Sequence, residues 1–266
     1  MFDPFNRKIN YLRVSITDRC NLRCVYCMPE EGIRLMDHSD ILPYEKIVEV
    51  IREGIALGIT KVRITGGEPL VRKGVVNLVE MIAKLEGITD FGMTTNGILL
   101  EQFAVALAQA GLQRVNISLD TINPEKYAQT TRGGDIKLVM AGIRAAKQAG
   151  ISPIKINCVV KGSSDEPDAV DVREFCRKND LEVRFIHEMD LDNGCFTLVE
   201  GGDGGNCRNC NRLRLTANGM IKPCLFNNIG FSIHELGIRE AMLRAVNVKP
   251  EKGQVNNHNL FYNIGG

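Results

Sequence analysis

Three cysteines lie close together near the start of the chain, at Cys20, Cys24 and Cys27. They follow an apolar-rich run, residues 11–17, and a tight loop there can direct three thiolates toward one point. Soft thiolates suit an iron–sulfur cluster or zinc, and both usually take four ligands. The next Cys or His is His38. The spacing therefore leaves two interpretations: a [4Fe–4S] cluster with one iron open to a small molecule, or half of a zinc site completed by a distant residue.

A second triplet follows far downstream, at Cys207, Cys210 and Cys224. Residues 211–216 between them resemble a strand and residues 217–219 a turn, so a hairpin would return the third cysteine to the first two. On spacing alone a zinc knuckle is favoured over a second three-cysteine [4Fe–4S] cluster, provided that a fourth ligand is available. The candidates for that ligand are His187, Cys195 and His234.

A glycine-rich turn follows the strand predicted over residues 61–65. Gly66 and Gly67 let the backbone approach a ligand closely, and exposed N–H and C=O groups there can bind an amine or a carboxylate. Glu68 follows them, and Pro69 stiffens the exit. An ordinary strand-to-helix turn is the alternative.

Cations occur inside several predicted strands, although buried parallel strands should be almost entirely apolar. If these side chains point inward, they form a cavity for a polyanion such as a phosphate chain; if outward, they are solvated or paired edges. Thr94 and Ser118 at strand ends could line the same polar pocket, or could be caps and turn formers. The cations are Arg13, Lys61, Arg63, Lys155 and Arg184.

The elements that would position these motifs alternate between strands and helices. Residues 47–55, 75–85 and 136–143 carry apolar stripes at helical spacing between the strands. Six such units predict a parallel sheet with right-handed crossovers. Because the motifs recur at the carboxyl ends of strands, a partial barrel is favoured over an open sheet. The predicted strands span residues 11–17, 61–65, 90–95, 114–119, 154–160 and 182–186.

The strand–helix alternation stops after Met189, and a Gly/Asp-rich stretch follows. This change predicts two regions: an α/β barrel domain over residues 1–190 and a small C-terminal extension over residues 191–266, which carries the second triplet. At 266 residues and 44% apolar content, the chain can bury a core of that size.

Charge and composition narrow the function classes further. The net charge of +1 indicates neither a nucleic acid nor a membrane partner, and there is neither a signal-peptide start nor a run of about 18 apolar residues. We therefore expect a cytoplasmic protein in which nine cysteines are not disulfide-bonded. Six of the nine fall in the two triplets, which again indicates metal or cluster binding.

Taken together, the first triplet with Tyr26 and the turn at residues 66–69 resemble the radical S-adenosylmethionine (SAM) superfamily. The longer stretches 18–24, 26–29, 62–70 and 184–186 resemble one branch, the GTP 3′,8-cyclase (MoaA) family of molybdenum-cofactor biosynthesis. The second triplet with Arg212 and Arg214, and the final Gly265 and Gly266, are also similar to that family.

The resemblance implies an incomplete (β/α)6 TIM-type barrel with a small C-terminal iron–sulfur extension, and a [4Fe–4S] cluster at each end of the cavity. The first triplet would hold the SAM-binding cluster and the second an auxiliary cluster that anchors guanine, while the Gly-Gly tail would enter the active site and support catalysis. SAM contacts would come from Tyr26, Gly66, Gly67, Glu68, Ser118 and Met189. GTP contacts would come from Arg13, Lys61, Arg63, Thr94, Lys155, Arg184, Arg212 and Arg214.

The reaction implied by the resemblance starts with reductive cleavage of SAM. The resulting radical would abstract the ribose C3′ hydrogen of GTP, the ribose carbon would attack guanine C8, and a further reduction would complete the cyclic nucleotide. The implied partners are an electron-donor protein, the downstream cyclic pyranopterin monophosphate synthase and a second copy of the chain in a homodimer.

One departure from the family concerns the C-terminal part. The interval from Met189 to Cys207, and the segment after Cys224, are shorter than in the family. An enzyme with an auxiliary cluster that acts on another nucleotide or on a peptide is therefore an alternative. A non-catalytic iron–sulfur or zinc protein is a more remote one.

Overall fold

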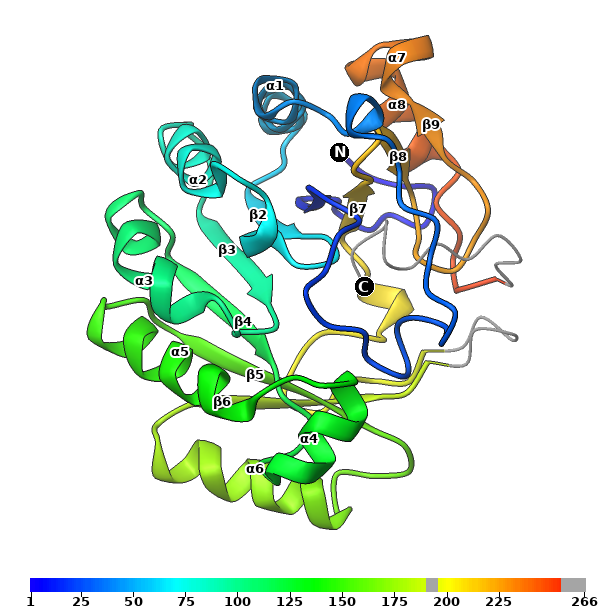
Figure 1. The fold of residues 1–266 in the computed structure, drawn as a ribbon. Helices are drawn as coiled ribbons and strands as arrows, with labels where there is room; N and C mark the ends of the chain where they lie inside the picture. Colours follow the sequence, from blue (N-terminus) through cyan, green and yellow to red (C-terminus); the bar gives the residue numbers. More distant parts are fainter. Residues whose placement is uncertain (190–195, 255–266) are drawn as a thin grey trace.

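Six parallel strands lie side by side in the order of the chain and form the centre of the molecule (Figure 1). The structure, a computed structural model, describes residues 1–189 and 196–254. The sheet curves around one side without closing, with β6 at one edge, so it is the incomplete α/β barrel that was predicted. The strands are β1 (Tyr11–Ser15), β2 (Lys61–Thr65), β3 (Asp90–Thr95), β4 (Arg114–Ser118), β5 (Ile154–Val160) and β6 (Glu182–His187).

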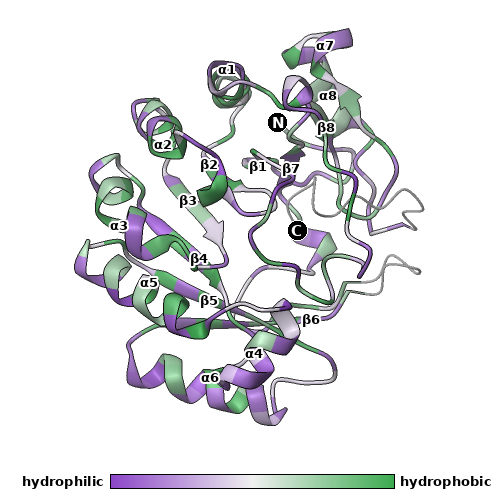
Figure 2. Ribbon diagram, in the orientation of Figure 1, coloured by the Kyte–Doolittle hydropathy of each residue, from purple (hydrophilic) through white to green (hydrophobic). Residues whose placement is uncertain are grey.

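Amphipathic helices cover the outer side of this sheet (Figure 2). The apolar stripes predicted between residues 47 and 143 pack against the strands in one continuous core. No helix in the described part of the chain is both long and apolar enough to cross a bilayer. The main helices are α1 (Tyr44–Ala56), α2 (Val75–Ala83), α3 (Leu100–Gln109), α4 (Pro124–Thr131), α5 (Ile136–Gln148) and α6 (Pro167–Lys178).

The two faces of the sheet differ in polarity. In β5, Ile154, Ile156 and Cys158 are buried in the core beneath the helices, whereas the alternating residues Lys155 and Asn157 are only partly buried. Successive side chains of a strand point to opposite faces, so the polar residues lie on the inner, concave face. The cations within the predicted strands therefore point inward and form a polar barrel interior.

The C-terminal region extends the same sheet. Strand β7 (Arg212–Leu215) pairs in parallel with β1, and β8 (Met220–Lys222) and β9 (Phe231–Ser232) follow as antiparallel strands. The hairpin predicted for the second triplet is thus confirmed, and its first strand lies directly beside the barrel. Helices α7 (Ile233–Leu236) and α8 (Ile238–Asn247) complete the described chain, and α8 packs against α1 (Figure 1).

Candidate active site

The loop that carries the first cysteine triplet packs directly against the glycine-rich turn after β2. The backbone N–H groups of Gly67 and Glu68 donate to the carbonyl oxygens of Thr17 and Arg19, each at 2.8 Å. A Cβ added to Gly67 would lie 2.4 Å from the carbonyl oxygen of Arg19. A Cβ added to Gly66, which has a φ of 144°, would lie 2.5 Å from that of Thr17. Both glycines are therefore required for this close backbone approach, independently of any ligand.

Glu68 is 1% exposed and ties the turn to the end of β3. Its carboxylate accepts from the Leu70 N–H at 3.0 Å, the Thr95 hydroxyl at 2.8 Å and the Asn96 N–H at 2.6 Å. Burial raises the pKa of Glu68 to about 7, and these hydrogen bonds partly oppose the shift. The Asn96 side chain in turn donates to the Cys20 Sγ at 3.8 Å. Glu68 thus acts on the cysteine loop through Asn96.

The carboxyl end of α4 holds the other side of the cysteine loop. The Arg132 guanidinium donates to the carbonyl oxygens of Arg23 and Met28, both at 2.9 Å. The Val25 N–H donates to the Thr130 carbonyl at 2.9 Å. Helix α4, which was not predicted, therefore supports the cysteine loop.

Tyr26, between the second and third cysteines, is anchored by a carboxylate at the end of β4. Its hydroxyl donates to Asp120 Oδ2 at 2.8 Å, and Asp120 Oδ1 accepts from the Val159 N–H at 2.8 Å. Burial raises the pKa of Asp120 above its ordinary value. Ser118 lies two residues earlier and is half-buried. Sequence analysis missed Asp120 because a carboxylate after a strand has no distinctive spacing.

The three thiols of this loop fit an iron–sulfur cluster by their chemistry. The Cys27 side chain is exposed, and Cys20 and Cys24 are half-buried. All eight cysteines in the described residues are free thiols. Burial and the neighbouring Cys27 and Asp120 raise the pKa of Cys24 to about 12, so a metal must displace the proton for the thiolate to form.

Three arginines lie in one row across the concave face. The strand registers pair Arg13 of β1 with Arg63 of β2 on one side and with Arg214 of β7 on the other. Two residues before Arg13, and therefore on the same face, Tyr11 is flanked by Lys61 and Arg212 in the same way. Neighbouring strands are about 5 Å apart, so five cations are gathered on three adjacent strands.

Arg63 is the most enclosed of these cations, with 2% of its surface exposed. Its Nη1 donates to Asn116 Oδ1 at 2.7 Å, while its Nε finds no partner in the described residues. A Cβ at Gly92 on the neighbouring strand would lie 3.2 Å from its Cζ, so the glycine makes room for the guanidinium. Burial lowers the pKa of Arg63 to about 10. Such a buried cation without a carboxylate partner fits a site that receives an anion.

Two carboxylates on the concave face, Asp90 and Glu182, are already paired with cations. Asp90 accepts from the Arg114 guanidinium at 2.6 and 2.7 Å, and Glu182 forms an ion pair with Lys155. Lys155 therefore has a neutralising partner, unlike Arg63. Burial and the neighbouring cations Arg13 and Arg212 lower the pKa of Arg214 to about 9.

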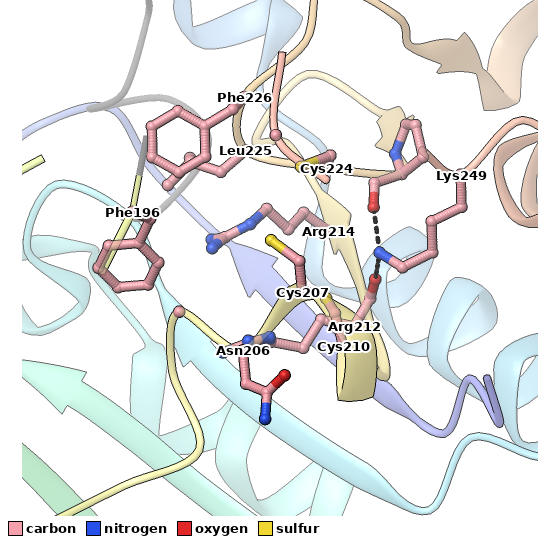
Figure 3. Close-up of a pocket in the computed structure, with 13 residues that line it drawn as sticks. Phe196, Asn206, Cys207, Cys210, Arg212, Arg214, Cys224, Leu225, Phe226 and Lys249 are labelled. Carbon is pink, nitrogen blue, oxygen red and sulfur yellow. Dashed lines mark hydrogen bonds between the residues drawn. The ribbon is translucent and has the colours of Figure 1, made fainter. Parts of the chain in front are cut away.

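The second cysteine triplet lines a cavity next to this arginine row (Figure 3). The cavity has a volume of about 70 Å³ and opens to solvent. Arg212 and Arg214 form part of its wall together with the three cysteines. Phe196 and Phe226, with ring centroids 6.1 Å apart, form an apolar wall, and Met189 packs beside Phe226. The cysteines are Cys207, Cys210 and Cys224.

The zinc alternative for this cavity finds little support in its geometry. Among residues 1–189 and 196–254, no three His, Cys, Asp or Glu side chains converge on one metal position. His187 and His234 do not line the cavity, and Cys195 lies outside the described residues. A cluster tolerates wider spacing, because each cysteine binds a different iron. Burial alone would raise the pKa of Cys210, but Lys249 and Arg212 lower it to about 6, which favours a thiolate ligand.

The remaining predicted residues divide between described and undescribed parts of the chain. Thr94 lies on the concave face beside Asn116, with its hydroxyl buried and without a hydrogen bond in the described residues. Arg184 of β6 follows on the same face, opposite Asn157. Gly265 and Gly266 lie outside the described residues.

Comparisons with known proteins agree with this arrangement. A sequence profile of the Radical SAM superfamily matches residues 14–176, which run from the end of β1 beyond β5 and include the first triplet and the glycine-rich turn. Members of that superfamily use a [4Fe–4S] cluster with SAM. The chain also resembles the solved structure of Streptococcus suis SuiB, with a TM-score of 0.66 at 17% identity, over 92% of this chain and 67% of that one. At this identity the likeness is one of fold.

Curated relatives match nearly the whole chain. The GTP 3′,8-cyclase of Alkaliphilus oremlandii is 40% identical over 300 residues, covering 95% of this chain and 94% of the relative. The GTP 3′,8-cyclase of Thermodesulfovibrio yellowstonii is 40% identical over 305 residues, covering 94% and 95%. Both alignments are longer than the 266 residues here, so these relatives contain residues without a counterpart in this chain. The chain belongs to the GTP 3′,8-cyclase family of the radical SAM superfamily.

Proposed function

We propose that this protein is a GTP 3′,8-cyclase, which converts GTP to (8S)-3′,8-cyclo-7,8-dihydroguanosine 5′-triphosphate in the first step of molybdenum-cofactor biosynthesis. The observation that carries the proposal is the row of Arg13, Arg63 and Arg214 beside the cavity of the second triplet. The buried Arg63 guanidinium, whose Nε has no hydrogen-bond partner in the described residues, fits a phosphate oxygen of a triphosphate.

The first triplet and its supports would hold the cluster and SAM, which supply the electron and the hydrogen-abstracting group when bound. Cys20, Cys24 and Cys27 would ligate the cluster. The SAM contacts that we propose are Tyr26, Gly66, Gly67, Glu68, Ser118 and Met189. Of these, the glycine turn and Glu68 also hold the cysteine loop in place, so they would orient SAM both directly and through that loop.

The second triplet would hold an auxiliary [4Fe–4S] cluster that anchors the guanine base. Its position beside Arg214 supports this, because a base at the cavity and a triphosphate on the arginine row would then span one nucleotide. The arginines orient the substrate so that ribose C3′ and guanine C8 approach each other. Lys61, Thr94, Lys155, Arg184 and Arg212 complete the proposed GTP site.

We further propose that Gly265 and Gly266 enter this site and support catalysis. Deleting both should leave iron content unchanged and lower formation of the cyclised nucleotide. Unchanged turnover after the deletion would show that the tail has no such role.

The proposed partners follow from the same reaction. Each turnover takes up two electrons, one to cleave SAM and one to complete the product, so an electron-donor protein is required. The product is the substrate of a cyclic pyranopterin monophosphate synthase. A cytoplasmic location and a homodimer are also part of this proposal.

The product identifies the function directly. Reconstituted protein would be incubated anaerobically with SAM, reductant and either GTP or ATP, and the nucleotides separated by chromatography before mass spectrometry. The cyclised product is isomeric with GTP, because the hydrogen atom removed from C3′ is replaced by a proton and an electron. A new isomer from GTP but not from ATP is expected. 5′-Deoxyadenosine without that isomer would favour the alternative, a radical SAM enzyme for another nucleotide or a peptide.

A further inference from the structure

Two buried cations outside the proposed substrate site hold the backbone around the second cysteine triplet. The first is Arg7, which is 7% exposed and lies in a closed N-terminal loop. Its Nε donates to Asp3 Oδ2 at 2.5 Å, and the other carboxylate oxygen accepts from the backbone N–H groups of Phe5 and Arg7. The Phe5 ring centroid lies 5.0 Å from the guanidinium carbon. These contacts fix the orientation of the guanidinium.

The remaining donors of Arg7 reach two distant parts of the chain. Nη1 donates to the carbonyl oxygens of Cys207 at 2.6 Å and Glu251 at 3.0 Å, and Nη2 donates to that of Pro250 at 2.7 Å. The Cys207 carbonyl also accepts from the Cys210 N–H at 3.2 Å, which closes the turn between these two cysteines. Arg7 therefore fixes the cysteine turn against the segment that follows α8.

The second cation is Lys249, which is 3% exposed and lies behind the cysteines (Figure 3). Its Nζ donates to the carbonyl oxygens of Arg212 at 2.8 Å and Pro223 at 2.5 Å. Arg212 follows Cys210 by two residues, and Pro223 directly precedes Cys224. Lys249 thus joins the start of β7, two residues after Cys210, to the residue between β8 and Cys224.

We propose that Arg7 and Lys249 are positioning residues for the auxiliary cluster, which together form a two-cation brace. This inference rests on the proposed second cluster. Between them the two side chains donate to five backbone carbonyl oxygens. One of these belongs to Cys207, and each of the other two cysteines lies within two residues of another of these carbonyls. The described residues give the brace a single carboxylate, Asp3, for two buried charges. A cluster held by three thiolates would supply further negative charge beside Lys249.

The test isolates each cluster in the full-length chain. In the background Cys20→Ala/Cys24→Ala/Cys27→Ala only the auxiliary cluster can load, and we expect about four irons per chain. Arg7→Met or Lys249→Met in this background should weaken retention of the cluster against a chelator by about 10- to 100-fold. Controls are Lys8→Met, which removes the exposed neighbour of Arg7, and Lys222→Met, which removes a half-buried lysine on β8.

A complementary background separates positioning from general loss of structure. With Cys207→Ala/Cys210→Ala/Cys224→Ala only the first cluster loads, and Arg7→Met should leave its iron content and 5′-deoxyadenosine formation within about twofold of the parent, because the brace contacts only the second triplet. Arg7→Lys should recover part of the retention. Equal losses in both backgrounds, or no loss in the auxiliary background, would overturn the brace. A parent auxiliary background without iron would overturn the second cluster, and with it this inference.

Discussion

The two cysteine triplets lie in opposite electrostatic surroundings. The first is flanked by two buried carboxylates: Glu68 accepts a hydrogen bond from Asn96, and Asp120 accepts one from Tyr26. The second is flanked by cations, Arg212, Arg214 and Lys249 among them. The first surroundings suit a ligand with positive charge, such as the sulfonium and amino groups of SAM, and the second suit the phosphates of a nucleotide.

The supports of the two triplets differ as well. Backbone hydrogen bonds from the glycine turn, together with the Arg132 guanidinium at the carboxyl end of α4, hold the first loop, and they come from elements within the barrel. Side-chain cations from both ends of the described chain hold the second. The first site is therefore supported by elements of the barrel itself, whereas the second depends on contacts between segments that are distant in the sequence.

The largest effects should come from the cysteines themselves. Cys24→Ala should reduce 5′-deoxyadenosine formation to the background given by reductant alone, because the SAM-binding cluster loses a ligand. Cys224→Ala should keep this activity and abolish the cyclised nucleotide. Quantifying both products by mass spectrometry tests the contrast, and deoxyadenosine from Cys24→Ala would refute the assignment of the first triplet.

Glu68 gives the first site a pH signature. Burial raises its pKa from 4.5 to about 7. In the folded protein it therefore keeps its proton where the unfolded chain has released it, so its contribution to the free energy of unfolding falls as pH rises from 4.5 to 7. The difference between wild type and Glu68→Gln should decrease by about 3 kcal/mol over this range. Urea unfolding of the cluster-free protein measures it, and a flat difference would contradict the burial of the carboxylate.

A substitution of Arg63 tests the proposed GTP site separately from the first triplet. Arg63→Met should raise the dissociation constant of GTP by about 10- to 150-fold, the equivalent of about 1.5–3 kcal/mol for a charged hydrogen bond. SAM cleavage without GTP should remain, because the first triplet is untouched. Isothermal titration with GTP provides the measurement, and Lys84→Met on an exposed helix surface is the matched control. Loss of SAM cleavage with unchanged GTP affinity would reverse the assignment.

Two glycine substitutions should show the smallest effects and separate the sites. Gly67→Ala and Gly92→Ala should each destabilise the protein by about 1–3 kcal/mol through overpacking. Gly67→Ala should impair the first cluster, since its Cβ would lie 2.4 Å from the Arg19 carbonyl. Gly92→Ala should impair GTP binding, since its Cβ would crowd Arg63. Iron content and GTP affinity would be measured on both variants. A loss of GTP affinity in Gly67→Ala together with a loss of iron in Gly92→Ala would contradict these assignments.

Local patterns in the sequence predicted much of the fold. The bounds of β2, β3 and β5 agree with the prediction, and those of the other barrel strands differ by one or two residues. This is because alternating burial and flanking turn residues act locally. The motifs at residues 20–27 and 207–224 also drew attention to both cysteine triplets, because the members of each triplet are close in sequence.

Contacts between distant segments were not predictable in the same way. Arg7 and Cys207 are 200 residues apart, and nothing in a short N-terminal stretch indicates that its arginine reaches that carbonyl. The pairing of β7 with β1 and the ion pair of Lys155 with Glu182 depend on strand order and register. Both are set by the tertiary fold rather than by local sequence.

The most direct test of the separate roles of the two sites follows the C3′ hydrogen atom of GTP into 5′-deoxyadenosine. Anaerobic turnover with SAM, reductant and GTP deuterated at C3′ should give equal amounts of cyclised nucleotide and 5′-deoxyadenosine, with deuterium in the deoxyadenosine. Cys224→Ala should give deoxyadenosine without deuterium. Unlabelled deoxyadenosine from the wild-type protein, with no cyclised nucleotide, would contradict the account.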